Sequence, residues 1–185
     1  VDVGDHLAYT ATLSDGSALP AWLTFDPATR TFSGTPGNDD VGNISVKVVA
    51  TDDAGASATQ TFTVSVANTN DGPVASAQIA DQGATEDAGF NFQVPSNSFT
   101  DVDVGDHLAY TATLADGSAL PAWLTFDPVT RTFSGTPGND DVGQVSVKIT
   151  ATDDAGASAT QTFTVSVANT NDGPVASAQI SDQAA

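Results

Sequence analysis

Residues 61–73, with the sequence TFTVSVANTNDGP, decide the fold of this chain. Phe62, Val64 and Val66 alternate with polar residues, a pattern typical of a strand with one buried face. The Asn, Asp, Gly and Pro residues that follow end this strand, because such a cluster cannot continue a hydrogen-bonded ladder. The same letters return unchanged at residues 162–174. We therefore interpret residues 68–73 and 169–174 as short joints between β-modules.

The chain is built on an internal repeat with a period of 101 residues. Residues 1–84 match residues 102–185, and only eight of these 84 pairs differ. This period is the size of a small domain rather than of a solenoid unit. We expect residues 1–73 to form a first repeat that lacks its N-terminal strands, residues 74–174 a complete repeat, and residues 175–185 the start of a third. The pattern indicates an excerpt from a longer array.

Apolar alternation recurs through the complete repeat, and no helical period appears in it. Asp127-Pro128-Val129-Thr130 joins two of the alternating runs, and a Pro at the second turn position predicts a tight hairpin there. Seven short strands in about a hundred residues predict an all-β chain of tandem seven-stranded Greek-key β-sandwiches. The expected strands are residues 77–80, 90–94, 108–114, 123–126, 131–134, 145–150 and 160–167.

The alternation also predicts the core. Trp123 could serve as a sugar-stacking platform, but its position beside Leu124 and Phe126 favours a core residue. Buried aromatic side chains should supply most of the hydrophobic stabilisation. The residues expected to point inward are Phe90, Phe92, Leu108, Tyr110, Trp123, Phe126, Phe133, Val147, Phe163 and Val165.

Charge narrows the class of partner. The chain has 23 acidic and four basic residues, a net charge of −19. This balance argues against nucleic acid and against an anionic membrane surface as partners, because binding to either needs Lys and Arg.

Other residue types exclude further classes of function. No run reaches the ~18 apolar residues of a membrane span, and the absence of Cys excludes disulfide and thiolate chemistry. His6 and His107 occupy one repeat position, and no catalytic arrangement surrounds them, so we expect no enzyme.

The acidic residues gather at places where a cation could bind. Asp101, Asp103 and Asp106 precede a strand with Gly105 among them, a spacing that brings several oxygens round one centre. Strand order places Asp153 and Asp154 at the same end of the sandwich. Glu86-Asp87, Asp140-Asp141 and the joint 169–174 fall at the other end. The alternatives are that Asp simply favours turns or that a solvated acidic surface maintains solubility.

The expected metal ligands all offer carboxylate or amide oxygens, which a hard cation such as Ca²⁺ prefers. They are Asp2, Asp5, Asp39, Asp40, Asp52, Asp53, Asn68, Asn70, Asp71, Glu86, Asp101, Asp103, Asp106, Asp140, Asp141, Asp153, Asp154, Asn169, Asn171 and Asp172.

Several of these motifs carry a resemblance to a known family. The segment from Asp101 to Tyr110, DVDVGDHLAY, resembles the cadherin DxDxGxN segment, and residues 147–156 resemble the cadherin strand that ends in AxDxG. Residues 68–73 are similar to the DxNDNxP linker, one residue shorter. Residues 120–137 resemble the dystroglycan-type cadherin-like repeats (also described as an Ig-like, cadherin-superfamily domain) of large bacterial surface adhesins, including biofilm proteins of the RTX and BapA type. The cadherin LDRE segment is absent, and Gly138-Asn139-Asp140-Asp141 stands in its place.

The resemblance implies a calcium-binding repeat with Ca²⁺ between domains, on the bacterial cell surface or outside the cell, exported by type I secretion. Three functions remain open. The first is a calcium-stiffened stalk of an adhesin, in contact with neighbouring repeats and supporting adhesion and biofilm formation. The second is a binding module for extracellular polysaccharide or for a copy of itself. The third is an accessory domain of a secreted polysaccharide-degrading enzyme. The near-identity of the copies favours the stalk.

Overall fold

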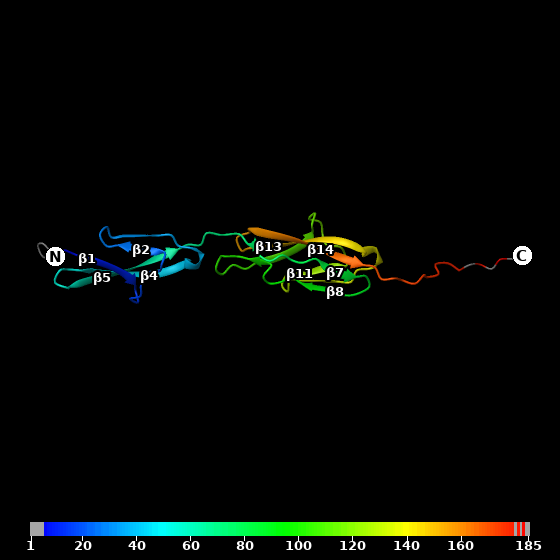
Figure 1. The fold of residues 1–185 in the computed structure, drawn as a ribbon, viewed down its shortest axis with the longest axis horizontal. Helices are drawn as coiled ribbons and strands as arrows, with labels where there is room; N and C mark the ends of the chain where they lie inside the picture. Colours follow the sequence, from blue (N-terminus) through cyan, green and yellow to red (C-terminus); the bar gives the residue numbers. More distant parts are fainter. Residues whose placement is uncertain (1–5, 180, 182, 184–185) are drawn as a thin grey trace. The chain divides into compact units, whose positions relative to one another are not determined.

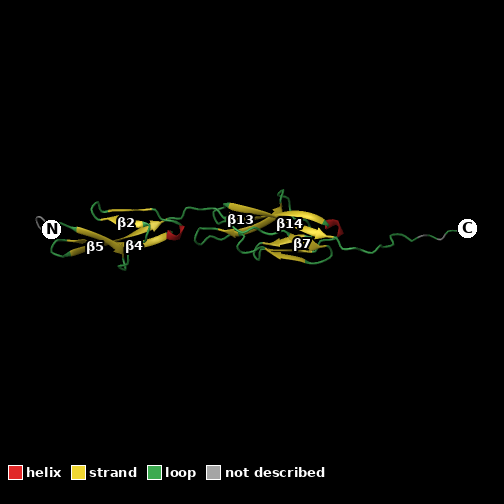
Figure 2. Ribbon diagram, viewed as in Figure 1, coloured by secondary structure: helices red, strands yellow, loops and turns green. Residues whose placement is uncertain are grey.

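A computed structural model describes residues 6–179, 181 and 183 of the chain. It consists of strands and two short 3₁₀ turns, and these form two compact units (Figures 1 and 2). The first unit holds Val1–Asp71 and the second holds Gly72–Asp101 and His107–Ala185, and the loop Val102–Asp106 is grouped with the first. Each unit is described separately below.

The second unit contains two sheets. The larger has four strands in the order β10 (Ala109–Leu114), β13 (Gly143–Thr152), β14 (Ser158–Ala168) and β7 (Gln82–Thr85). Its pairs are antiparallel except that of β14 with β7, which is parallel with Val165 opposite Gln82. The smaller sheet is antiparallel in the order β11 (Leu124–Asp127), β12 (Thr132–Gly135) and β8 (Phe90–Gln93).

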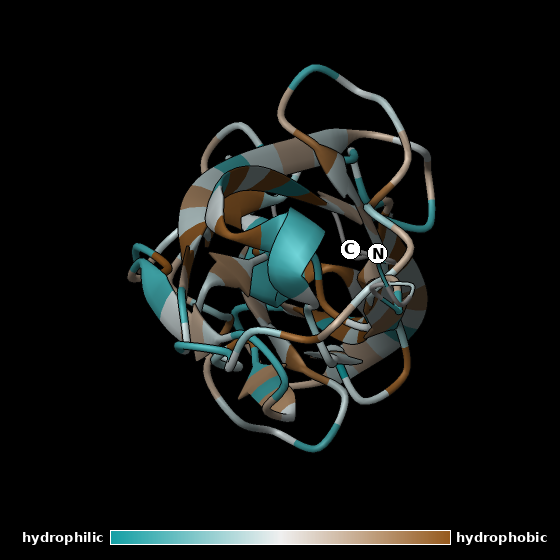
Figure 3. Cartoon of the chain, turned by 90° about the vertical axis from the view of Figure 1, so that its right-hand side faces the viewer, coloured by the Kyte–Doolittle hydropathy of each residue, from teal (hydrophilic) through white to brown (hydrophobic). Residues whose placement is uncertain are grey.

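The core of the second unit is made by both sheets. Phe133 on β12 contacts Phe163 on β14 edge to face, with ring centroids 5.5 Å apart, and Phe92 on β8 lies at the same distance from Phe163. Strand alternation explains this packing, because every second side chain of a strand faces the opposite sheet. The same alternation is visible as bands of brown and paler colour along the strands in Figure 3. The predicted β-sandwich is confirmed.

The predicted core is confirmed in part. Phe90, Phe133, Val147, Phe163 and Val165 are buried. The other predicted members are only partly buried but pack against them; these are Phe92, Leu108, Tyr110, Trp123 and Phe126. Several buried residues were not predicted, and they are Ile79, Ala84, Val94, Phe99, Leu124, Ile149, Ala151 and Val167.

One predicted strand is wrong. Residues 77–80 form no strand, and the chain instead makes the short pair β6 (Val74–Ala75) with β9 (Phe99–Thr100), followed by β7. The Gln161 side chain takes the place of a ladder here. Its Nε2 donates to the carbonyls of Ala77 and Ser98, and its Oε1 accepts from the Ile79 amide at 3.0 Å. A side-chain amide satisfies the backbone, so the segment needs no strand partner.

The first unit has the same design with fewer strands. Its sheets are β1 (Ala8–Leu13), β4 (Gly42–Thr51) and β5 (Ser57–Val66), and the hairpin β2 (Leu23–Asp26) with β3 (Thr31–Gly34). Among the described residues no strand pairs with β5 where β7 pairs with β14, and none pairs with β3 where β8 pairs with β12. Phe62 is accordingly 41% exposed, whereas its equivalent Phe163 is 3% exposed.

Candidate cation site

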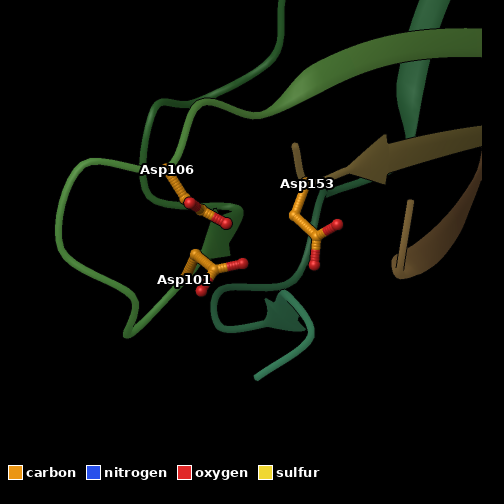
Figure 4. Close-up of side chains that lie close together, drawn as sticks. All are labelled: Asp101, Asp106 and Asp153. Carbon is orange, nitrogen blue, oxygen red and sulfur yellow. The ribbon is translucent and has the colours of Figure 1, made fainter. Parts of the chain in front are cut away.

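Three carboxylates from separate positions in the sequence meet beside the start of β10. One carboxylate oxygen from each of Asp101, Asp106 and Asp153 lies within 4.8 Å of the other two, and Figure 4 shows the three side chains close together, with Asp101 and Asp106 extending toward Asp153. Asp101 and Asp106 stand at the two ends of one loop, and Asp153 follows β13. Two unit charges about 5 Å apart repel by roughly 3 kcal/mol at an effective dielectric constant near 20. A divalent cation would convert this repulsion into attraction.

Local backbone structure holds these side chains in place. Asp153 is only 6% exposed, and its Oδ1 accepts hydrogen bonds from the amides of Ala155 and Ala157 at 3.0 and 2.8 Å. The opposite loop turns at Gly105, whose φ of +96° lies in the region that favours glycine, and the Asp106 amide donates to the Asp103 carbonyl at 3.3 Å. Both carboxylate-bearing turns are therefore ordered by their own backbone contacts.

Asp103 contacts the predicted joint. Its side chain is 6% exposed, and its Oδ2 accepts a hydrogen bond of 2.8 Å from the backbone amide of Asp71. The Asp71 carboxylate in turn accepts a hydrogen bond of 2.8 Å from the Asn38 side-chain amide. The loop that carries Asp101 and Asp106 at its ends thus contacts residue 71 of the segment 68–73 through Asp103.

Asp154 lies beside Asp153 in the sequence but is directed elsewhere. Its Oδ2 accepts from the His107 amide at 3.3 Å and lies 3.4 Å from His107 Nδ1. The first repeat shows the same arrangement between Asp53 and His6. Asp52 of the first repeat corresponds to Asp153, and its Oδ1 likewise accepts hydrogen bonds from two backbone amides, those of Ala54 and Ala56. In each Asp-Asp pair, therefore, the first Asp orders the turn and the second contacts a histidine.

A second acidic region lies near the end of β14. Glu86 is 2% exposed, and its Oε1 accepts a hydrogen bond of 2.6 Å from the Thr170 amide. Its Oε2 is buried without a hydrogen-bond partner among the described residues. A buried carboxylate oxygen without a partner is costly. This orphaned oxygen is the observation that best fits a cation ligand at this end.

Asn139 was missed by the sequence analysis. It opens the 3₁₀ turn η2 (Asn139–Asp141), and its Nδ2 donates to the Asp172 carboxylate at 2.6 Å. In the first repeat Asn38 opens the turn η1 (Asn38–Asp40) and donates to the Asp71 carboxylate in the same way. The signal was its place next to the predicted Asp140-Asp141 pair. Asp141 itself turns back to accept the Gly138 amide at 2.9 Å.

Among the described residues, the remaining predicted carboxylates form no further group of three. Asp2 and Asp5 lie outside the described residues. Asp40 accepts the Gly37 amide, as Asp141 does that of Gly138. Asn171 Nδ2 donates to the Asp172 carbonyl at 3.3 Å. Asp39, Asn68, Asn70, Asp140 and Asn169 lie in the turns or joints where the sequence places them and stay predicted ligands.

The donor chemistry fits a hard cation. Calcium takes six to eight oxygen ligands and accepts mixtures of carboxylates, carbonyls and water. The cluster of Asp101, Asp106 and Asp153 offers three carboxylates, and Glu86 offers a fourth at the other region. With no cysteine and with exposed histidines, these residues do not suit soft or borderline metals.

The part of the chain that the structure describes has no helix long and apolar enough to cross a membrane.

Known adhesins contain similar sequences. The "Serine-rich adhesin for platelets" of Staphylococcus aureus (strain USA300) is 35% identical over 147 residues, which cover 80% of this chain and 6% of that protein. The protein of the same name from strain MRSA252 is also 35% identical over 147 residues, 10% of its length. The chain therefore spans only a small part of the curated relatives that it matches.

Two solved protocadherin structures have a similar fold. Human mucin-like protocadherin EC1-2 matches with a TM-score of 0.63 and 16% identity, covering 92% of this chain and 87% of that one. Protocadherin gammaB7 EC3-6 matches with a TM-score of 0.60 and 20% identity, covering 90% of this chain and 41% of that one. At this identity the likeness shows the fold alone.

A family match covers most of the chain. The family described as "Putative Ig domain" matches twice, over residues 1–67 and 72–168. The two matches correspond to the two copies of the repeat, and together with the adhesin relatives they point to a non-enzymatic module. This chain of tandem Ig- and cadherin-like β-sandwich repeats belongs to the "Putative Ig domain" family.

Proposed function

We propose that this chain is a calcium-binding tandem repeat of a bacterial cell-surface adhesin, and that calcium stiffens it as a stalk which supports adhesion and biofilm formation. The observation that carries the proposal is the meeting of Asp101, Asp106 and Asp153 within 4.8 Å. The adhesin relatives and the family support a surface repeat. The extracellular location and type I secretion are part of the proposal.

The cluster and the joint are linked in this proposal. Asp103 belongs to the loop between Asp101 and Asp106, and it accepts the Asp71 amide. A cation that binds the ends of this loop would restrain Asp103 and, through it, the segment 68–73. Because the cation binds the ordered arrangement better than a splayed one, it shifts the population toward the ordered joint. Neighbouring repeats are the partners that such a joint requires.

Calcium binding is tested by titration calorimetry on the whole chain and on single variants. Asp101→Asn and Asp106→Asn each remove one negative charge from the cluster but keep the side-chain shape. Because site affinity depends on ligand charge, each should weaken the tightest calcium-binding step by about tenfold or more, roughly 1.4 kcal/mol. Asp153 is left unchanged, because its contacts with Ala155 and Ala157 also order a turn.

The control is Asp154→Asn. This variant removes the same charge next to the cluster, but Asp154 contacts His107 and not the cluster oxygens. It should change the affinity by less than about threefold, since exposed charges are screened. If the chain takes up no calcium in the millimolar range, or if all three variants lose affinity equally, the acidic residues are a solvated surface and the proposal fails.

A further inference from the structure

A shallow hollow recurs at the same place in both repeats, beside the His107–Asp154 contact in the second and the His6–Asp53 contact in the first. In the second unit it measures about 620 Å³ and is lined by Leu108, Ala109, Tyr110, Pro128, Val129 and Arg131. In the first unit it measures about 400 Å³ and is lined by His6, Leu7, Tyr9, Pro27, Ala28 and Arg30. None of the lining residues is acidic, although the chain has 23 acidic residues and only four basic ones. Two of those four lie in the hollows.

An arginine lies over a tyrosine in each hollow. The guanidinium carbon of Arg131 is 5.7 Å from the centre of the Tyr110 ring, and that of Arg30 is 5.6 Å from the centre of the Tyr9 ring. Among the described residues the salt bridges are those of His6 and His107, and no carboxylate pairs with Arg131 or Arg30. Stacking on the ring fixes the guanidinium but leaves its N–H donors available.

The backbone at this arginine is strained. Arg131 has a φ of +56° and Arg30 a φ of +57°, at the last loop position of the hairpins β11–β12 and β2–β3. Glycine takes this conformation freely, and an arginine there pays a steric cost. Among the described residues, glycine stands at seven other positions of positive φ. A strained residue that recurs with the same stacking contact points to a role beyond the fold.

We propose that each hollow binds a carboxylate-bearing sugar unit of an acidic polysaccharide. The planar guanidinium fork of Arg131 matches a carboxylate in two-point contact. Leu108, Pro128 and Val129 offer an apolar wall for the C–H face of a sugar ring, and Val129 is highly exposed. Because the hollow recurs with each repeat, a polymer with regularly spaced carboxylates would engage several weak sites at once. Physiological salt screens most of the chain's negative charge over distances of more than about 8 Å, and the carboxylates beside the hollows, Asp154 and Asp53, each contact a histidine.

The test measures binding of polygalacturonate to the whole chain at physiological ionic strength in EDTA. The chelator separates this proposal from the calcium proposal, because the hollow needs no cation and a failure of either leaves the other standing. The chain should bind polygalacturonate more tightly than dextran sulfate and should not bind neutral dextran. A sulfate preference would overturn the assignment of the ligand, and the absence of polygalacturonate binding would overturn the site.

Arg131→Gly is the decisive variant, because glycine suits the backbone conformation there. It should weaken binding by about tenfold or more while the melting temperature stays unchanged or rises, and adding Arg30→Gly should abolish binding. Arg131→Lys keeps the charge but not the fork, so it should bind less tightly than the original chain. Lys148→Gln is the matched control, since it removes one positive charge from β13 outside the hollow and should change binding less than twofold.

Three outcomes would contradict the proposal. If Lys148→Gln weakened polygalacturonate binding as much as Arg131→Gly, the effect of Arg131 would be one of net charge alone. A lowered melting temperature in Arg131→Gly with unchanged binding would make the arginine structural. Self-association of the chain in sedimentation experiments that Arg131→Gly abolishes would assign the hollow to carboxylates of a second copy instead of a polysaccharide.

Discussion

Single carboxylates in this chain have distinct tasks that their hydrogen bonds reveal. Asp127 closes the hairpin turn between β11 and β12, where its carboxylate accepts from the Thr130 hydroxyl at 2.8 Å and from the Val129 amide at 2.9 Å. The Thr130 hydroxyl is the largest cause that holds the pKa of Asp127 below its ordinary value of 3.8, and the two turn amides act in the same direction. These hydrogen bonds favour the ionised carboxylate over the protonated one.

The sign of the resulting pH dependence follows from the lowered pKa. The stabilising contribution of Asp127 is complete above pH 3.8, its unfolded value, and is lost as the pH falls through the lower pKa of the folded state. Thr130→Val should raise the pKa of Asp127 toward 3.8, because the hydroxyl donor is lost. NMR titration of the side-chain carboxyl measures this. Asp116, whose pKa Ser118 lowers, is the internal control and should not shift. An unchanged Asp127 midpoint would contradict this reading of the turn.

The sequence predicted the acidic residues of the site better than their partners. The spacing of Asp101 and Asp106 round Gly105 was sufficient to place both near one centre, because the ligands are local to one loop. The place of Asn139 beside Asp140-Asp141 was a signal, but its contact with Asp172 could not be predicted from the sequence. The burial of Glu86 could not be predicted either, because it depends on a contact with Thr170. The different contacts of Asp153 and Asp154 could not be predicted either, because they depend on which of the two adjacent side chains the turn directs inward.

At the scale of elements, long strands were predictable and short ones were not. Alternation over β13 and β14 reads directly from sequence, since each has ten or more residues. The segment 77–80 was misread as a strand, because its backbone is satisfied by the side chain of Gln161, more than 80 positions away. The parallel pairing of β7 with β14 was missed for a different reason: β7 has four residues, and its one buried apolar residue, Ala84, does not define a partner.

Gly135 on β12 lies against the backbone of Trp123, the residue just before β11. A Cβ at this position would lie 1.7 Å from the backbone oxygen of Trp123, whereas one at Gly83 on β7 would meet no atom within 4 Å. Gly135→Ala should therefore displace β11 from β12 and destabilise the chain by about 3 kcal/mol or more. Gly83→Ala, which places alanine where the next copy has Ala184, should cost less than about 1 kcal/mol. Equal midpoints in urea unfolding for the two variants would refute this account of the β11–β12 pair.

At the scale of the whole molecule, the two repeats have nearly the same sequence and different degrees of burial. Phe62 and Phe163 occupy one repeat position, and each contacts the equivalent aromatic ring, Phe32 or Phe133, with ring centroids 5.5 Å apart. Phe163 is additionally covered by Phe92 of β8, for which the first unit has no equivalent among the described residues. Among the described residues the first unit therefore has a less covered core, and the edges of β3 and β5 that carry no further strand there are open to pairing.

This difference gives a matched pair of substitutions. Phe163→Ala should cost about 3–5 kcal/mol, the usual range for a buried phenylalanine. Phe62→Ala should cost less than half as much, because 41% of Phe62 is already exposed. Hydrogen exchange resolved for each unit separates the two effects, and faster exchange in the first unit of the unsubstituted chain is expected as well. Equal costs would mean that the first unit gains its missing cover in solution.

The stalk proposal predicts a mechanical response of the array. Without a divalent cation the cluster carboxylates repel, and the joint at residues 68–73 is expected to flex. Calcium should order the joint and stabilise the fold by mass action, by about 2.7 kcal/mol at a hundred times the dissociation constant. Sodium would screen the repulsion without bridging the carboxylates. Calcium-specific ordering therefore distinguishes the stalk from a merely acidic surface.

The most direct measurement is small-angle X-ray scattering on a chain of several complete repeats, in EDTA and in millimolar CaCl₂ at fixed ionic strength. The account predicts that calcium increases the maximum dimension and that Asp101→Asn with Asp106→Asn in every repeat removes most of this increase, whereas Asp154→Asn does not. A maximum dimension that is the same in EDTA and in calcium would contradict the calcium-stiffened stalk.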